Sequence, residues 1–216
     1  MLSQKKKMKD KKTLKEKNVK QIWLFFGLNL IAFLIVVFTF SLKEDAGGLG
    51  DILYRKGIWF LLSPLIVFIL NGLVSANQKA ALISWRGKDN LPGCRAFTYY
   101  AIRDSRINLK RLKELHGDLP TLPADQNAKW YSIYKTYHSD VIISKSHQDY
   151  LLARDLCTFS FLTVLLLPIP VLVFGDHPMK YIYLIALALQ YLVLVIVAQN
   201  YGARFVCNVL ALESTK

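Results

Sequence analysis

Four long apolar stretches dominate the pattern of hydrophobic and polar positions along the chain. Each is close to the ~20 residues that an α-helix needs to cross a ~30 Å hydrocarbon core. The stretches are Ile22–Leu42, Ile58–Ala76, Cys157–Gly175 and Tyr181–Asn200. This pattern predicts an all-α integral membrane protein with four transmembrane helices, paired into hairpins at residues 22–76 and 157–200.

Between the hairpins, residues 77–156 form a polar segment whose apolar positions recur at helical spacing. Asp104 or Ser105 is the expected N-cap of a first short helix, which ends before Gly117. A second helix is expected after the L-P-T-L-P linker. A third stretch runs from Val141 without a helix breaker into the third span. We therefore expect a small helical domain with no sheet.

The charge distribution predicts how the spans are oriented. Residues 1–21 carry nine lysines against two acidic residues, and residues 77–156 carry 13 basic against 8 acidic residues. The connections 43–57 and 176–180 are neutral, and the tail 201–216 carries +1. Basic residues close to spans stay on the cytoplasmic side. Both termini and the middle segment are therefore expected in the cytoplasm, and the protein in a bacterial inner (plasma) membrane.

The first stretch is longer than a signal-peptide core and has no A-x-A-like site after it, so we expect an uncleaved signal anchor. The three cysteines form no C-x-x-C pair. They fall on the predicted cytoplasmic side or near the inner ends of spans. Because that compartment is reducing, no structural disulfide is expected.

Four amide side chains interrupt the apolar stretches: Asn29, Asn71, Gln190 and Gln199. An unpaired amide in hydrocarbon is costly, so these residues are expected to join helices within a protomer or between protomers, or else to line a water-filled path. No Asp, Glu, Lys or Arg lies deep within the four stretches. Proton-coupled transporters generally need such groups, so this class is disfavoured.

A basic and aromatic stretch follows the second span. Its cationic residues are Arg86, Lys88, Arg95, Arg103, Arg106, Lys110 and Arg111, interleaved with Trp85, Phe97, Tyr99 and Tyr100. Three partners fit this composition: anionic lipid headgroups, a nucleotide or nucleic acid, and an acidic soluble protein of the cytoplasm.

Enzymatic chemistry has one candidate, the pair Arg111 and His116. Their R-x-x-x-x-H spacing resembles HEPN-type ribonucleases, which implies cleavage of a phosphodiester. The alternative is a solvated basic helix face with His116 near its C-terminus. The remaining histidines of the segment, His138 and His147, have no i, i+4 partner and no neighbouring cysteine, so no metal site is expected. No nucleotide-binding or hydrolase motif occurs, and no cofactor is expected.

The segments W-R-G-K-D-N-L-P-G-C-R-A-F-T, L-P-T-L-P-A-D-Q-N-A-K-W-Y and H-Q-D-Y-L-L-A-R-D resemble a group of bacterial four-span inner-membrane proteins. In architecture the chain is similar to the membrane subunits of anti-phage defence systems such as Kiwa. This resemblance implies an oligomeric, non-enzymatic sensor or effector. A membrane-tethered ribonuclease and a passive channel or carrier are the alternatives.

Overall fold

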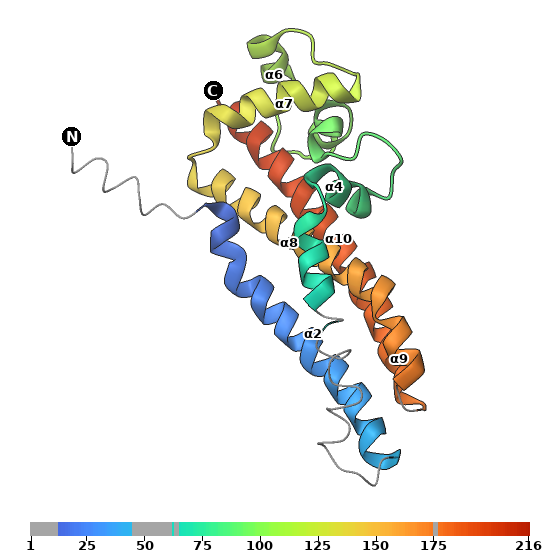
Figure 1. The fold of residues 1–216 in the computed structure, drawn as a ribbon. Helices are drawn as coiled ribbons and strands as arrows, with labels where there is room; N and C mark the ends of the chain where they lie inside the picture. The colour runs from blue at the N-terminus through green and yellow to red at the C-terminus, as the bar shows by residue number, and fades with distance from the viewer. Residues whose placement is uncertain (1–12, 45–61, 63–64, 175–176) are drawn as a thin grey trace, which may run out of the picture. The chain divides into compact units, whose positions relative to one another are not determined.

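The computed structural model describes residues 13–44, 62, 65–174 and 177–216, and within these residues it contains helices and no strands. The longer helices, labelled in Figure 1, are α2 (Leu14–Glu44), α4 (Ala76–Ser84), α6 (Leu109–His116), α7 (Pro123–Tyr137), α8 (Val141–Leu166), α9 (Pro168–Phe174) and α10 (Met179–Glu213). The all-α prediction is confirmed for this part of the chain. Most of the lysine-rich tail, the connection 45–57 and the start of the predicted second span lie outside the described residues.

Three helical segments are long and apolar enough to cross a membrane: Leu14–Val36, Val141–Val173 and Met179–Glu213. A fourth is obtained if the helices Leu65–Leu73 and Ala76–Ser84, bent by 104°, count as one span. The expectation of an unbroken helix from Val141 into the third apolar stretch is confirmed by α8.

The chain divides into two compact units. Unit 1 comprises residues 1–22, 92–152 and 200–216, and unit 2 comprises residues 23–91 and 153–199. The sequence suggested a domain at residues 77–156 alone, whereas unit 1 also takes in the final turns of α10. The dividing points fall inside α2, α8 and α10, and each of these helices is unbroken there.

Helix α6 of unit 1 begins later than the sequence indicated. Asn108, rather than Asp104 or Ser105, is the N-cap of α6, and its side chain accepts a hydrogen bond from the Arg111 N–H. An Asn side chain there satisfies an N–H group that has no partner within the helix. Gly117 ends the helix at a φ of 73°, as expected of a residue without a Cβ.

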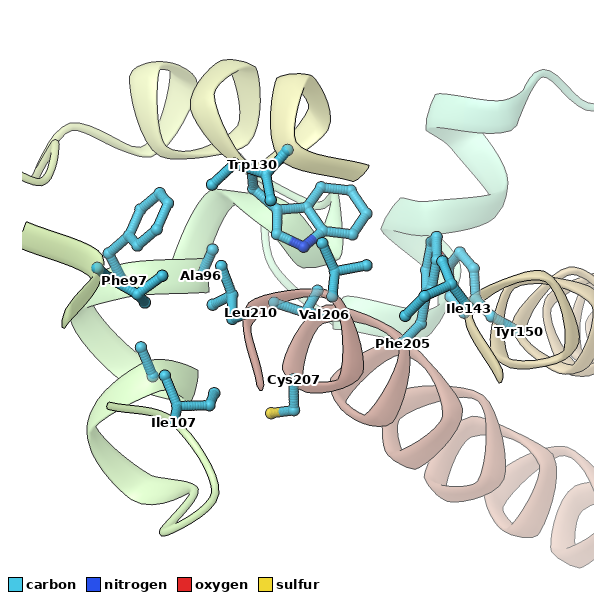
Figure 2. Packing of buried hydrophobic residues seen from close by; sticks show 14 residues of the cluster. Ala96, Phe97, Ile107, Trp130, Ile143, Tyr150, Phe205, Val206, Cys207 and Leu210 are labelled. Carbon is cyan, nitrogen blue, oxygen red and sulfur yellow. The ribbon is translucent and has the colours of Figure 1, made fainter. Parts of the chain in front are cut away.

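Aromatic and aliphatic side chains form the core of unit 1 (Figure 2). Phe205 of α10 is buried and stacks on His147 with ring centroids 4.7 Å apart. Edge contacts join Phe205 to Trp130 at 5.1 Å and to Tyr134 at 5.2 Å. Trp130 also covers Gly93, where a Cβ atom would lie 2.7 Å from the indole ring. The absence of a side chain at Gly93 therefore lets the 3₁₀ turn Pro92–Arg95 approach α7 closely.

Unit 2 keeps much of its apolar surface on the outside. Of the most apolar 18-residue window in each candidate span, 11% is buried for Leu14–Val36 and 22% for Met179–Glu213, against 44% for Val141–Val173. Among the described residues, apolar side chains are buried in one cluster around Phe33 and Leu187 and in another around Val67 and Phe159. Such helices suit a solvent of lipid, because their outward side chains need no protein cover.

Candidate functional site

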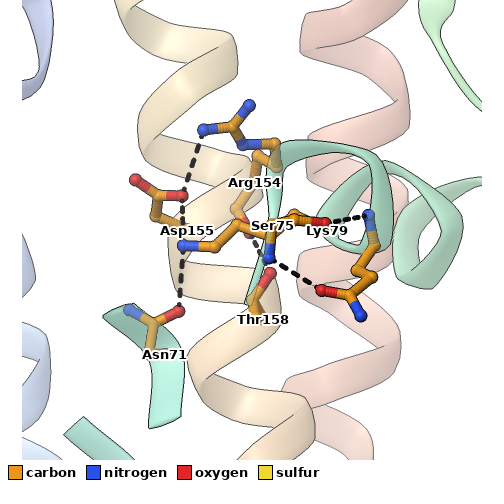
Figure 3. Close-up of polar contacts among 7 residues, drawn as sticks. Asn71, Ser75, Lys79, Arg154, Asp155 and Thr158 are labelled. Atoms are coloured by element: carbon orange, nitrogen blue, oxygen red, sulfur yellow. Dashed lines mark hydrogen bonds and ion pairs between the residues drawn. The ribbon is translucent and has the colours of Figure 1, made fainter. Parts of the chain in front are cut away.

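A cluster of buried charges lies in unit 2 (Figure 3). Lys79 Nζ donates to Asp155 Oδ1 at 3.0 Å and to Asn71 Oδ1 at 3.3 Å. Arg154 Nη2 approaches the same carboxylate oxygen at 3.4 Å. Each of these four residues is no more than 9% exposed. One carboxylate thus joins two cationic side chains in a buried setting.

The bend between helix Leu65–Leu73 and α4 positions Lys79. Ser75 is the N-cap of α4: its hydroxyl accepts from the Gln78 N–H at 3.3 Å, and its own N–H donates to Gln78 Oε1 at 2.8 Å. This capping box fixes the start of the helix. One turn later the Lys79 side chain meets Asn71, the residue eight positions earlier on the preceding helix.

Charges removed from water are held only where partners compensate them, and removing one partner is strongly destabilising. The Lys79–Asp155 ion pair therefore ties the bent segment to α8. Arg154 is only partly compensated, because its buried Nε has no hydrogen-bond partner among the described residues. Removing any charged member of this cluster would leave another buried charge with fewer partners, and this favours the observed arrangement of α4 and α8.

Sequence reasoning missed this cluster because it assigned Lys79, Arg154 and Asp155 to the polar segment between the hairpins. The available signal was the R-D pair directly before the third apolar stretch, with a lysine just after the second. Charges at the ends of two neighbouring spans are candidates for a pair.

The amides expected in the spans all make polar contacts in unit 2. Gln190 Nε2 of α10 donates to Asn29 Oδ1 of α2 and to Ser160 Oγ of α8, both at 3.1 Å. Gln199 Nε2 donates to the Ile83 carbonyl at 2.8 Å, and Asn71 holds Lys79. Each of the four amides thus has a hydrogen-bond partner on another helix of the same chain.

The seven cationic residues of the basic stretch divide between the units. Arg86 and Lys88 are exposed in unit 2, directly after α4, and the other five belong to unit 1. No family model, curated protein or solved structure matches this chain. The side chains themselves therefore provide the basis for assigning chemistry to each group.

Trp85 begins the unit 2 part of this stretch and is 60% exposed. It ends α4 in the left-handed conformation, with a φ of 51°, and its Nε1 donates to Tyr191 Oη at 3.1 Å. Tyr191 in turn donates to the Leu82 carbonyl at 3.1 Å. An exposed indole followed by Arg86 and Lys88 has the composition of a membrane–water interface.

In unit 1, Arg106 is committed to Asp104 and Asn208. Its Nε donates to Asp104 Oδ1 at 3.0 Å, its Nη2 to Asp104 Oδ2 at 2.6 Å and its Nη1 to Asn208 Oδ1 at 3.0 Å. The fork of hydrogen bonds from Arg106 outweighs the opposing effect of burial and lowers the pKa of Asp104 to about 2. Lys110 is exposed on α6, whereas Arg95 and Arg103 both contact the Tyr99 ring.

Arg111 and His116, the suggested ribonuclease residues, have different partners. Arg111 pairs with Glu114 at 3.0 Å, one turn along α6. His116 Nε2 lies 2.8 Å from Glu213 Oε1, and the other carboxylate oxygen of Glu213 accepts from Tyr137 Oη at 2.5 Å. Glu213, which the sequence did not single out, therefore joins α6 and α7 to the end of α10.

The other two histidines have their own partners. His138 Nδ1 lies 2.8 Å from the Lys135 carbonyl, and His147 Nδ1 lies 2.9 Å from Tyr134 Oη. Within the described residues, no three His, Cys, Asp or Glu side chains gather as a metal-binding group. Cys94, Cys157 and Cys207 are all buried, and none of them forms a disulfide.

Proposed function

We propose that this chain is a multi-pass protein of a bacterial inner membrane that works as an oligomeric sensor or effector. Unit 1, in the cytoplasm, binds a soluble partner or signal, and the membrane helices of unit 2 respond. Anti-phage defence is the setting that the resemblance in architecture suggests. In this proposal the chain is not an enzyme.

One observation carries the proposal. The dividing points between the two units fall inside unbroken helices, between Leu152 and Ala153 in α8 and between Gln199 and Asn200 in α10. A continuous helix transmits a displacement along its length, since its hydrogen-bonded backbone resists local bending. Arg154 and Asp155 of the buried cluster follow directly after the dividing point in α8.

Two features support the membrane setting. Candidate spans that keep most of their apolar residues outward need lipid or further copies of the chain around them. The exposed Trp85, Arg86 and Lys88 suit anionic headgroups at the cytoplasmic face, where each basic residue near the surface contributes about 1 kcal/mol.

Native mass spectrometry of the protein, gently extracted from its own host, tests the assembly. We expect a defined homo-oligomer that carries a soluble protein or signal molecule. The same preparation, reconstituted in dye-loaded vesicles, should change their permeability only when that bound component is present. A bare monomer that never alters the vesicles would contradict the proposal. Leakage without any added component would favour a passive channel.

A second comparison tests the route through α8. Replacing Leu152 and Ala153 together by glycine weakens the helix by roughly 1 kcal/mol for each glycine and also removes the half-buried Leu152 side chain and the buried Ala153 methyl group. We expect unit 1 to keep its bound component while the vesicle response is lost. A control for helix weakening alone replaces the exposed Ala128 and Ser132 of α7 by glycine, in a helix that has no residue in unit 2. An equal loss in the control would contradict a role for α8.

A further inference from the structure

Helix α4 meets the helix before it at a sharp bend. Helix Leu65–Leu73 and α4 are bent by 104°, so their axes are close to perpendicular. The backbone hydrogen bonds of the first helix end where the Val74 N–H donates to the Leu70 carbonyl. The capping box at Ser75 then provides partners for N–H groups at the start of α4, without the preceding helix. If Leu65–Leu73 crosses a membrane, α4 therefore lies close to the membrane plane.

The exposed side chains of this segment are polar. Asn77 and Gln78 are exposed at the start of α4, and Arg86 and Lys88 are exposed shortly after its end. Amide and charged side chains that face hydrocarbon are costly. The membrane–water interface accommodates the same groups. A position of α4 within the hydrocarbon core, as half of a bent span, is therefore disfavoured.

Contacts with two membrane helices hold α4 in this orientation. Near its start, the buried ion pair of Lys79 connects it to α8. Near its end, Tyr191 Oη of α10 donates to the Leu82 carbonyl at 3.1 Å. Gln199 Nε2 of α10 donates to the Ile83 carbonyl at 2.8 Å. The last carbonyls of a helix have no partner within it, so α10 satisfies the end of α4 while α8 holds its start.

The loop after α4 is also held by hydrogen bonds. Trp85 Nε1 donates to Tyr191 Oη at 3.1 Å, although 60% of the Trp85 residue is exposed. The Ser84 hydroxyl donates to Asn90 Oδ1 at 2.5 Å and accepts from the Arg86 N–H at 3.3 Å. The indole and the arginine are therefore carried by a loop whose two ends are joined.

We propose that α4 is an interfacial helix rather than part of a span, and that Trp85, Arg86 and Lys88 bind the anionic headgroups of inner-leaflet lipids. Charge selects this partner, because the loop carries two exposed cations against the single carboxylate of Asp89. An indole at headgroup level and basic residues beside anionic phosphates are both favourable. Headgroup binding also stabilises the packing of α8 with α10, since α4 contacts both. The inference rests on the proposed membrane setting and names the lipid class that this surface takes.

Electron paramagnetic resonance of nitroxide labels, in vesicles of phosphatidylglycerol and phosphatidylcholine, measures the depth of each segment. Leu65→Cys, Ile69→Cys and Leu73→Cys, at exposed positions of the preceding helix, provide a reference series. Accessibility to oxygen and to a water-soluble nickel chelate should show a depth change of about 12 Å along this series, at 1.5 Å per residue. The native cysteines are buried and should take up little label.

Asn77→Cys and Gly87→Cys place labels at the two ends of the proposed interfacial segment. Gly87 tolerates a side chain, because a Cβ atom there meets nothing within 4 Å. Both labels should lie at headgroup level. A label in the hydrocarbon core or in bulk water at either position would overturn the interfacial helix. A reference series without a depth gradient would instead contradict the membrane setting itself, so the two failures are distinguishable.

A second measurement tests the lipid class. Native mass spectra are recorded from micelles doped with equal amounts of phosphatidylglycerol and phosphatidylcholine, and the ratio of the two lipids retained is compared between variants. The double variant Arg86→Ala/Lys88→Ala should lower this ratio about fivefold or more, since one basic residue near the surface already corresponds to about fivefold. An unchanged ratio would overturn headgroup binding.

The double variant Lys110→Ala/Lys113→Ala is the matched control. Both lysines are exposed on α6 of unit 1, and their removal lowers the net charge of the chain equally. We expect the lipid ratio to change little. A fall as large as that in Arg86→Ala/Lys88→Ala would overturn the assignment, because retention would then follow net charge alone. Near-ultraviolet circular dichroism checks that each variant keeps its tertiary packing.

Discussion

The two units differ in how they are stabilised. Unit 1 buries a continuous cluster of aromatic and aliphatic side chains around Phe205 and Trp130, as a water-soluble domain does. Unit 2 leaves many apolar side chains exposed and buries others in smaller, separate clusters, and its helices are also joined by Gln190 with Asn29 and by Lys79 with Asp155. Apolar contact gives little advantage when lipid is the alternative neighbour, so polar pairs contribute specificity in unit 2.

The largest effect is expected from Phe205→Ala, which removes the ring that contacts His147, Trp130 and Tyr134. Loss of a buried aromatic side chain costs about 3–5 kcal/mol. Hydrogen exchange should rise across residues 92–152 and 200–216, and the thermal midpoint should fall. Leu192→Ala, at an exposed position of the same helix, should change neither. Equal effects of the two variants would contradict a central role for Phe205 in the core of unit 1.

Asp155→Ala should come next, since it leaves Lys79 and Arg154 buried without their shared carboxylate. Breaking a buried pair in this way costs about 3 kcal/mol or more. Lys79→Met should cost less, because Arg154 still compensates Asp155. Thermal unfolding in detergent measures both, and hydrogen exchange should place the change in residues 65–91 and 153–166. Equal costs for the two variants would argue against a shared carboxylate.

Gln190→Leu should have a smaller effect. It removes the hydrogen bonds to Asn29 and Ser160, and side-chain hydrogen bonds between membrane helices contribute about 0.6 kcal/mol on average. Ala188→Leu, at an exposed position of α10, controls for the added apolar volume. A thermal midpoint identical in both variants would mean that this network does not hold the three helices together.

The last comparison concerns pH. Because the folded pKa of Asp104 is about 2, below its value of about 3.9 in an unfolded chain, its contribution to stability is present above pH 4 and is lost as the pH falls toward 2. Arg106→Gln removes the guanidinium that lowers the pKa of Asp104. The stability of unit 1 should then depend less on pH in this range. Unfolding between pH 2 and pH 5, followed by Trp130 fluorescence in a chain whose other three tryptophans are replaced by phenylalanine, measures this contribution, and an unchanged slope would contradict the assignment.

The sequence predicts the helices better than it predicts the contacts between them. Apolar runs and the absence of a breaker were sufficient for α8, and Gly117 marked the end of α6. The cap at Asn108 and the bend at Ser75 were missed, because several polar residues offered equivalent caps and the apolar pattern runs smoothly through the bend. The position of the cap and that of the bend both depend on tertiary contacts, which the local sequence does not specify.

Pairs between distant residues were the hardest to predict. Lys79 and Asp155 are 76 positions apart, and Gln126 meets Phe97 across 29 positions. Lysine and glutamine are normally solvated, so neither residue type indicates in the sequence that it has a buried partner. The four span amides were recognisable because hydrocarbon demands a partner for each, although their partners were not. Arg95 and Arg103 were singled out by composition, whereas their common contact with Tyr99 required the π-helical turn Ala96–Tyr100.

The burial of all three native cysteines has a practical consequence. Thiol-directed reagents applied to the folded protein need an accessible sulfur. The parent chain should therefore react little, and labelling would report the introduced cysteine. A single cysteine in place of exposed Thr121 would report unit 1, and one in place of exposed His177 would report the turn before α10. Labelling of intact cells with an impermeant maleimide would then read out membrane topology one residue at a time.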